Sequence, residues 1–144
     1  MMEEYRTDDA DIILLTMGSL AGTIKEVVDR WRGRGEKVGL VKLRLYRPFP
    51  AEELAEVLMG AKAVGVVEKD ISMGWVGALY TDVVAAFANV KRRPLFLDFV
   101  MGLGGRDVKF SDLDEVIEIT SGAASSGEVG KVLHWIGLDV EKVR

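Results

Sequence analysis

Three glycines within four positions, followed by an arginine and an aspartate, form the segment with the clearest potential for chemistry. The segment is Gly102–Val108, and it follows the apolar run Leu95–Val100, which is typical of a buried strand. Glycine loses the most conformational freedom on folding, so these glycines indicate backbone that turns sharply or comes close to another surface. Arg106 and Asp107 add a guanidinium and a carboxylate to that turn, and a guanidinium binds carboxylate or phosphate groups through two parallel hydrogen bonds.

A second segment of small residues, Gly18–Thr23, lies between an apolar run and a helical pattern. A strand, a loop and a helix N-terminus in this order can bind an anion, because free N–H groups and the helix dipole point outward. The segment lacks the Gly-x-Gly-x-x-Gly spacing of a dinucleotide site, and the alternative is a tight turn packed against a neighbour. Arg47 and Arg106 are candidates for contacts to an anion, or for ion pairs that hold the loops together. The carboxylates considered for those pairs are Glu68, Asp70 and Asp107.

Several catalytic chemistries are missing from the sequence. It contains no cysteine, which excludes disulfides, thiolate zinc sites, cysteine-bound iron–sulfur clusters and a cysteine nucleophile within this chain. The one histidine, His134, lies beside Trp135 without a clustered partner, which favours a packing or surface role over metal binding. Neither a Gly-x-Ser-x-Gly elbow nor a phosphate-loop lysine motif occurs. We therefore do not expect this chain to catalyse a reaction by itself.

The composition is that of a globular domain. The chain has 144 residues, of which 49% are hydrophobic and 29% charged, and its net charge of −4 carries no basic stripe of the kind that binds nucleic acid. Its apolar runs are too short to cross a membrane and its acidic N-terminus is unlike a secretory signal, so a cytoplasmic location is expected. Glutamine is absent and Asn89 is the single asparagine, which fits an organism that lives at high temperature.

Apolar runs alternate with helical patterns four times along the chain. The first helix illustrates the pattern, with apolar residues at positions 24, 27, 28 and 31. This alternation predicts a three-layer α/β fold, in which a mainly parallel sheet carries helices on both faces through right-handed crossovers. The predicted strands are Ile12–Leu15, Val38–Leu45, Ala63–Val67 and Leu95–Val100, and the predicted helices begin after Thr23, at Pro50, near Gly74 and after Ser111.

The loops with unusual composition all follow predicted strands. They contain Gly18 and Ser19, Arg47–Pro50, Glu68–Asp70 and Gly102–Asp107. Because parallel strands end at the same edge of a sheet, these loops should lie together, and ligand or partner surfaces of open α/β sheets lie at that edge. The sequence therefore predicts one functional surface.

We expect the α/β domain to span residues 1–120. The small and polar residues 121–127 predict a flexible connector. An apolar cluster within residues 128–144 predicts a short tail helix, which docks either on this domain or on a partner.

A series of motifs occurs in a fixed order within residues 11–108. They are Gly18-Ser19 with Gly22-Thr23, then Leu43–Pro50, Glu68–Ser72 with Gly74, Gly77–Tyr80, and Gly102–Val108. Together they resemble the C-terminal domain of the alpha subunit of pyruvate:ferredoxin oxidoreductase (pyruvate synthase) and its 2-oxoacid relatives. Residues 134–138 are also similar to the ends of such subunits.

The resemblance implies a transketolase C-terminal-like fold. It also implies an assembly that decarboxylates pyruvate on thiamine diphosphate, passes electrons through [4Fe–4S] clusters to ferredoxin, and forms acetyl-CoA. In a full alpha subunit a preceding domain contributes to the thiamine site, and this sequence has neither that domain nor a Gly-Asp-Gly cofactor motif. Thiamine diphosphate, magnesium and the clusters are therefore expected in other domains or subunits, and no cofactor is expected in this chain.

The resulting hypothesis is a non-catalytic assembly domain whose partners are the other domains or subunits of the complex. Ferredoxin and CoA are expected as partners of the whole complex. No role is expected for nucleic acid or a membrane. The alternative is a module that binds the phosphate of CoA or a nucleotide through Gly18–Thr23 and nearby arginines. No catalytic residue or metal ligand is assigned in either case. The candidate interface or anion-binding residues are Gly18, Ser19, Gly22, Thr23, Arg47, Pro48, Phe49, Gly74, Gly77, Gly104, Gly105, Arg106 and Asp107.

Overall fold

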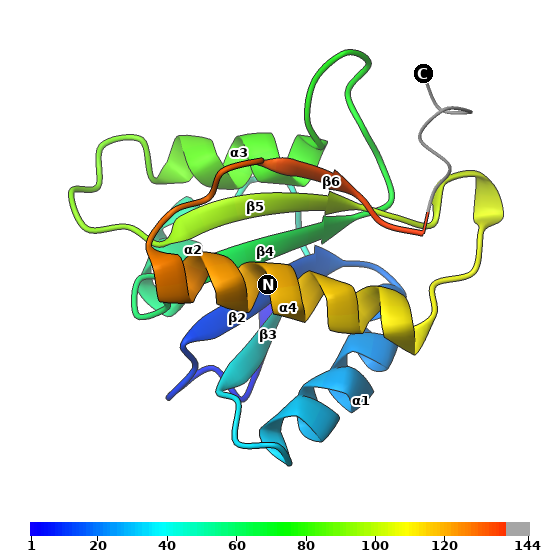
Figure 1. The fold of residues 1–144 in the computed structure, drawn as a ribbon. Coiled ribbons are helices and arrows are strands. Elements are labelled where there is room, and N and C mark those ends of the chain that lie inside the picture. The colour runs from blue at the N-terminus through cyan, green and yellow to red at the C-terminus, as the bar shows by residue number, and fades with distance from the viewer. Residues whose placement is uncertain (138–144) are drawn as a thin grey trace.

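The fold is an α/β sandwich, seen in a computed structural model that describes residues 1–137 (Figure 1). The strands are β1 (Met2–Tyr5), β2 (Ile12–Met17), β3 (Val38–Leu43), β4 (Ala63–Glu68), β5 (Leu95–Val100) and β6 (Leu133–Trp135). The helices are α1 (Leu20–Arg32), α2 (Ala51–Leu58), α3 (Ala78–Ala86) and α4 (Phe110–Ser126), with a short 3-10 turn at Leu103–Gly105. No helix in this described part is long and apolar enough to cross a membrane.

The strands form a single sheet in the order β1-β3-β2-β4-β5-β6. All neighbouring pairs are parallel except β1 with β3, which is antiparallel. Every residue of β4 is buried, and so is every residue of β2 except Met17, because helices cover both faces of the sheet. The four strands predicted from apolar runs are thus confirmed, together with the mainly parallel sheet, but β3 ends at Leu43 and not at the predicted Leu45.

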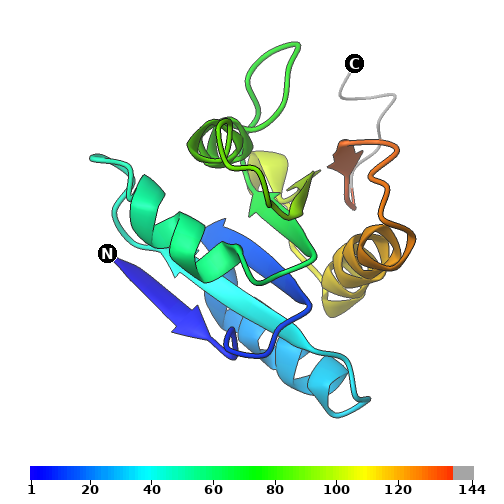
Figure 2. The same ribbon diagram turned by 90° about the vertical axis from the view of Figure 1, so that its left-hand side faces the viewer.

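A pair of helices covers each face of the sheet (Figure 2), and a separate hydrophobic core lies beneath each pair. On one face, α1 and α4 contribute residues such as Ile24, Val28 and Ile117. On the other face, α2 and α3 contribute residues such as Leu54 and Val83. This arrangement confirms the predicted three layers.

The two outermost strands were not predicted. β1 lies at one edge, where Glu3 pairs with Lys42 of β3, so charged residues replace the apolar run that marks a buried strand. β6 lies at the other edge, where the main-chain N–H of Asp98 donates to Val132 at 3.0 Å and that of Ile136 donates to Val100 at 2.9 Å. The predicted tail helix is therefore wrong for this part of the tail, which docks on its own domain as a strand. Residues 138–144 of that prediction lie outside the described residues.

The predicted flexible connector at residues 121–127 is also wrong, because α4 continues to Ser126. Within residues 121–127 the buried side chain is Ala123, which faces the sheet one helical turn after the buried Thr120. Thr120 and Ala123 are buried, and a Cβ on Gly65 of β4 would lie 2.8 Å from the Thr120 hydroxyl oxygen. Gly127 then ends the helix in a left-handed conformation, as glycine commonly does.

Helix starts differ from the prediction by a few residues. α1 begins at the buried residue Leu20, so Gly22 and Thr23 lie in its first turn instead of in a loop. α3 begins at Ala78, later than the predicted start near Gly74. α4 begins at Phe110, where the Lys109 N–H donates to the Asp112 carboxylate at 2.8 Å, so Ser111 is not its cap.

One crossover differs in hand from the rest. α1 and α4 lie on the same face, but β3 and β6 extend the sheet in opposite directions from β2 and β5 (Figure 1). The β5–α4–β6 unit therefore has the opposite hand to β2–α1–β3 and is an exception to the expected right-handed rule. The opposite face at the β4–β5 end of the sheet is already covered by α3, so α4 packs on the face that carries α1.

Candidate functional site

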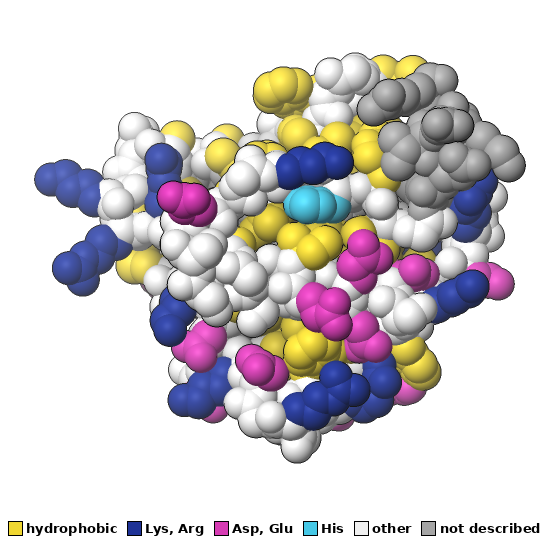
Figure 3. Space-filling view, in the orientation of Figure 1, with side chains coloured by type: hydrophobic (Ala, Val, Ile, Leu, Met, Phe, Trp, Pro, Cys, Tyr) yellow, Lys and Arg dark blue, Asp and Glu magenta, His cyan; other side chains and the backbone are white. Residues whose placement is uncertain are grey.

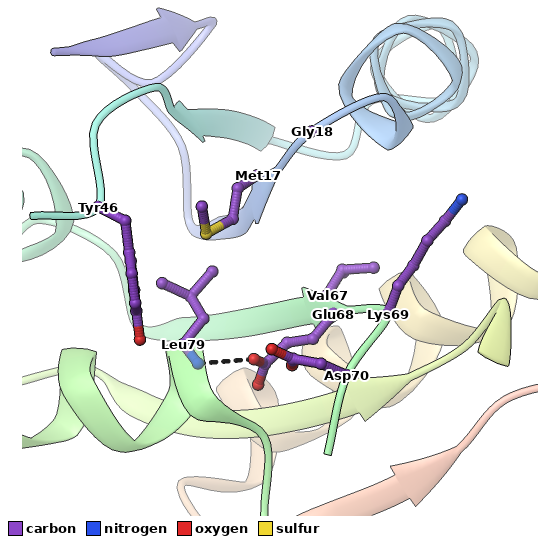
Figure 4. Close-up of a pocket in the computed structure, with 8 residues that line it drawn as sticks. All are labelled: Met17, Gly18, Tyr46, Val67, Glu68, Lys69, Asp70 and Leu79. Atoms are coloured by element: carbon purple, nitrogen blue, oxygen red, sulfur yellow. Dashed lines mark hydrogen bonds between the residues drawn. The ribbon is translucent and has the colours of Figure 1, made fainter. Parts of the chain in front are cut away.

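A cleft opens at the C-terminal edge of the sheet, between the ends of β2 and β4 (Figure 4). The chain leaves β2 toward β3 on one side and leaves β4 toward β5 on the other, so this is the point where the strand order reverses. Open α/β sheets bind ligands and partners at such points. The cleft has a volume of about 340 Å3, and it is lined by Met17, Gly18, Tyr46, Val67, Glu68, Lys69, Asp70 and Leu79.

Two carboxyl groups lie at or beneath the floor of this cleft. Glu68 at the end of β4 is 5% exposed, and Asp98 on the neighbouring strand β5 is fully buried. Backbone N–H groups at the start of α3 hold both: Leu79 and Tyr80 donate to Glu68 at 2.7 and 3.1 Å, and Gly77 donates to Asp98 Oδ2 at 2.7 Å. The side chains of β4 and β5 thus take the place of a local helix cap for α3.

The environment of these carboxyl groups favours the protonated form. Burial is the main cause that raises the pKa of Glu68 to about 10, and hydrogen bonding to Asp98 and the charge of Asp98 add to it. Burial likewise raises the pKa of Asp98 above its usual range. Within residues 1–137 no lysine or arginine forms an ion pair with Glu68, Asp70 or Asp98. Lys69 points away from the carboxyl groups, and its side chain lies against Gly102 (Figure 4).

Gly77 is required by this carboxyl pair. A Cβ at this position would lie 1.9 Å from Glu68 Oε2 and 2.3 Å from Glu68 Cδ. The backbone of Gly77 has an ordinary extended conformation with φ −68°. Lack of space, and not the left-handed freedom of glycine, therefore explains this residue.

Arg47 has a different partner from those considered in the sequence. Its guanidinium lies 3.0 Å from Asp82 of α3 and stacks over the ring of Tyr46, with 4.3 Å from its central carbon to the ring centre. The hydroxyl of Tyr46 also donates to Asp82, and burial and this bond raise the pKa of Tyr46 to about 12. Phe49 packs edge-on against Tyr46. An internal ion pair of Arg47 was the right kind of contact, but Glu68, Asp70 and Asp107 are the wrong partners.

The other predicted site residues lie along the same edge but do not all converge on the cleft. Gly18 lines it, whereas Ser19, Gly22 and Thr23 follow into α1. Gly104, Gly105, Arg106 and Asp107 lie in the exposed loop after β5, where both glycines have positive φ, and no described residue forms an ion pair with Arg106. Pro48 and Gly74 are exposed on their loops.

The cleft does not favour an anion. Two acidic side chains, Glu68 and Asp70, line it, and the basic side chain in its lining, Lys69, points away from them and lies against Gly102 (Figure 4). The guanidinium of Arg47, which follows the cleft residue Tyr46, is already paired with the carboxylate of Asp82. The anion-binding alternative therefore has no support in the geometry.

Sequence reasoning missed the pairing of Glu68 with Asp98. Glu68 was considered only as a partner for arginine, and Asp98 was not considered. The available signal was that Asp98 is the single charged residue inside the apolar run Leu95–Val100, and a charge inside a buried strand requires a partner.

The edge that carries the cleft also exposes apolar side chains. Met73 is 95% exposed and Trp75 is 68% exposed, both on the loop between β4 and α3, which projects from the body of the molecule (Figures 1 and 2). Figure 3 shows hydrophobic side chains over this loop and acidic side chains over α4. Large exposed apolar patches on a protein surface mark sites that bind a partner or a ligand. Among the described residues, the exposed large apolar side chains at or next to the C-terminal ends of the parallel strands are Met1, Met17, Leu45, Met73, Trp75 and Phe110.

The described residues do not supply ligands for the metal ions and clusters that the resemblance implies for the complex. Residues 1–137 contain no group of three histidine, cysteine, aspartate or glutamate side chains able to hold a metal ion. The sequence has no cysteine for a cluster. No step of thiamine or iron–sulfur chemistry is therefore assigned to these residues.

Comparison with solved structures places the fold in one class. Residues covering 82% of the chain superpose on 19% of a 2-oxoglutarate:ferredoxin oxidoreductase chain from Magnetococcus marinus, with a TM-score of 0.60 and 22% identity. An equal share superposes on 41% of a split-gene transketolase chain, with a TM-score of 0.62 and 14% identity. The protein thus has the α/β fold of domains found in transketolase and in 2-oxoacid:ferredoxin oxidoreductases.

Sequence comparison identifies the family. Residues 10–113 match the model of pyruvate:ferredoxin oxidoreductase core domain II, and the chain belongs to that family. It is 55% identical over 140 residues to pyruvate synthase subunit PorA of Pyrococcus abyssi and 40% identical over 138 residues to ketoisovalerate oxidoreductase subunit VorA of Pyrococcus horikoshii. These matches cover 97% and 96% of this chain but only 35% of each relative, so the chain spans about a third of their length. The resemblance inferred from the motifs is confirmed.

Proposed function

We propose that this chain is a non-catalytic assembly domain of a 2-oxoacid:ferredoxin oxidoreductase, and that the complex acts on pyruvate. Membership of the core domain II family carries this proposal, and the identity of 55% to a pyruvate synthase subunit, against 40% to a ketoisovalerate oxidoreductase subunit, favours pyruvate. The complex would convert pyruvate and CoA to acetyl-CoA and CO2 and reduce ferredoxin. Thiamine diphosphate, magnesium and [4Fe–4S] clusters would be held by its other domains or subunits.

The docking surface in this proposal is the C-terminal edge of the sheet. Its central element is the projecting loop with Met73 and Trp75, next to the cleft and the Tyr46–Phe49 cluster. Trp, Met and Tyr are enriched in the buried centres of protein interfaces. Arg106 and Asp107 add charged groups at the rim, where they would orient the partner more than bind it.

A domain replacement tests the proposal. This chain replaces the matching residues of Pyrococcus abyssi pyruvate synthase subunit PorA, which is expressed with the remaining subunits of that enzyme. We expect the hybrid to assemble, as measured by gel filtration, and to reduce a viologen dye only when pyruvate and CoA are both present. A folded hybrid subunit that neither assembles nor supports dye reduction would refute the assembly role.

Two substitutions in the same hybrid locate the surface. Trp75→Asp should abolish assembly, and Arg106→Glu should weaken it, while both leave the isolated domain folded, because these side chains are exposed. The control is Glu118→Lys on the acidic exposed face of α4, which should assemble normally. Equal assembly of all three variants would show that this edge is not the docking surface.

A further inference from the structure

The carboxyl groups of Glu68 and Asp98 present a problem of hydrogen bonding that the backbone does not solve. Asp98 is fully buried, and its Oδ1 has no hydrogen-bond donor, although its Oδ2 accepts from Gly77. A buried acceptor without a donor is destabilising, because it has given up its hydrogen bonds to water and received none in return. Glu68, the neighbour on β4, is almost as deeply buried and accepts from two N–H groups of α3.

We propose that Glu68 and Asp98 hold one proton between them, and that this shared proton fixes the start of α3 and with it the projecting loop Lys69–Gly77. The proton resides on Glu68, whose O–H then donates to the Oδ1 atom of Asp98 that otherwise lacks a donor. This arrangement removes one of two buried charges that would lie side by side without a cation. It goes beyond the proposed function and does not depend on it.

The groups around the pair are consistent with one retained proton. Asp70 adds a third carboxylate beside Glu68, and Tyr80 of α3 faces Asp98 as a neutral phenol whose pKa is raised by burial and by that charge. Lys69 lies against Gly102 instead of the pair, and Arg47 neutralises Asp82. The elements packed around Glu68 therefore supply negative charge and backbone donors but no cation within residues 1–137.

The loop depends on this anchor for its order. Its own main-chain bonds are local, from Ser72 to Val76 at 3.0 Å and from Trp75 to Ser72 at 2.8 Å. Where the loop joins α3, Gly77 donates to Asp98, and its backbone leaves no space for a Cβ beside the Glu68 carboxyl group. Loss of the proton would place two charges at this junction and release it.

The sign of the pH effect follows from the raised pKa of Glu68. In the unfolded chain a glutamate loses its proton near its ordinary pKa of 4.5, but in the folded chain it keeps the proton until about pH 10. Stability from this group is therefore complete below pH 4.5, declines as the pH rises, and is lost as the pH passes through about 10.

Asp98→Asn is the decisive variant, because it keeps the shape and supplies the missing donor. The asparagine oxygen can accept from Gly77, and its NH2 can donate to an ionised Glu68. We expect the urea midpoint of the wild type to fall at least twice as steeply as that of Asp98→Asn between about pH 6 and about pH 10. The control Asp11→Asn, at the exposed opposite edge, should follow the wild type. Parallel pH profiles for wild type and Asp98→Asn would overturn the proposal.

Two further readouts keep the test independent of that variant's folding. Infrared difference spectra near neutral pH should show the C=O stretch of a protonated carboxyl group in the wild type, and this band should vanish in Glu68→Gln. In a Trp31→Phe, Trp135→Phe background, fluorescence anisotropy of Trp75 should fall at alkaline pH as the loop is released. A wild type without the infrared band, or a Trp75 signal that does not change up to about pH 11, would contradict a shared proton that holds the loop.

Discussion

At the scale of single residues, two glycines differ in the space around them, and neither is needed for a left-handed backbone conformation. Gly77 lies against the Glu68 carboxyl group, where a Cβ would be 1.9 Å from an oxygen, whereas a Cβ on Gly22 in α1 would meet no atom within 4 Å. Both have negative φ, so neither requires glycine for its backbone conformation.

Substitution by alanine should therefore have opposite effects at the two positions. Gly77→Ala should lower the free energy of unfolding by about 1–3 kcal/mol, because the methyl group displaces the carboxyl group. Gly22→Ala should raise it by about 0.5–1 kcal/mol, because alanine favours the helix. Urea unfolding measures both, and a neutral Gly77→Ala variant would show that the carboxyl group can move without cost.

At the scale of elements, Arg47 joins the loop after β3 to α3. It bonds to Asp82 and stacks on Tyr46, whereas Arg106 on the loop after β5 forms no ion pair with a described residue. Arg47→Ala should leave the domain folded but lower its urea midpoint, and Arg106→Ala should leave the midpoint unchanged. An equal response of the two variants would contradict an internal role for Arg47. The effect of Arg47→Ala should shrink in Asp82→Asn, because the same ion pair is already lost there.

A second element-scale contact attaches β1 to the body of the domain. Glu3 bonds to Lys25 of α1 and lies 2.7 Å from the guanidinium of Arg44 after β3, and these bonds lower its pKa from 4.5 to about 2. A depressed pKa gives stability that is present above pH 4.5 and is lost as the pH falls through about 2.

Glu3→Gln should therefore reduce stability at neutral pH and flatten its decline between pH 4.5 and about 2. Because the pair is at the surface, added salt should narrow the difference between variant and wild type. Circular dichroism during acid titration measures the effect. If the variant and the wild type unfolded over the same pH range, Glu3 would have no special role in holding β1.

At the scale of the whole molecule, the two unpredicted strands close the edges of the sheet. β6 covers β5, where His134 stacks on Phe99 with 5.2 Å between ring centres and Ile136 is buried. Without β6, the apolar strand β5 would present unpaired N–H and C=O groups at an edge. Deletion of residues 128–144 should therefore lower stability and cause concentration-dependent association, measured by light scattering after gel filtration. A truncated chain that stays monomeric and keeps its urea midpoint would show that β6 is dispensable.

The sequence by itself determined the buried strands, the parallel sheet and the edge that carries the loops, because burial patterns and turn residues are local features of the chain. Continuous apolar runs such as Ile12–Leu15 identify strands that are buried on both faces, and their alternation with amphipathic helices favours a parallel sheet. A parallel sheet places the loops after the strands at one edge, because parallel strands share a direction. The same loops carried the motifs from which the family was inferred.

Only the tertiary structure decided which distant residues meet. Glu68 and Asp98 lie thirty positions apart, as their residue numbers give, and they are neighbours because β4 pairs with β5 in the register that sets Val66 opposite Asp98. Arg47 finds Asp82 because α2 and α3 share a face, and the chain after α4 becomes an edge strand because β5 offers free backbone groups. Such contacts depend on sheet order and register, and these follow from the packing of the whole chain, which no local pattern encodes.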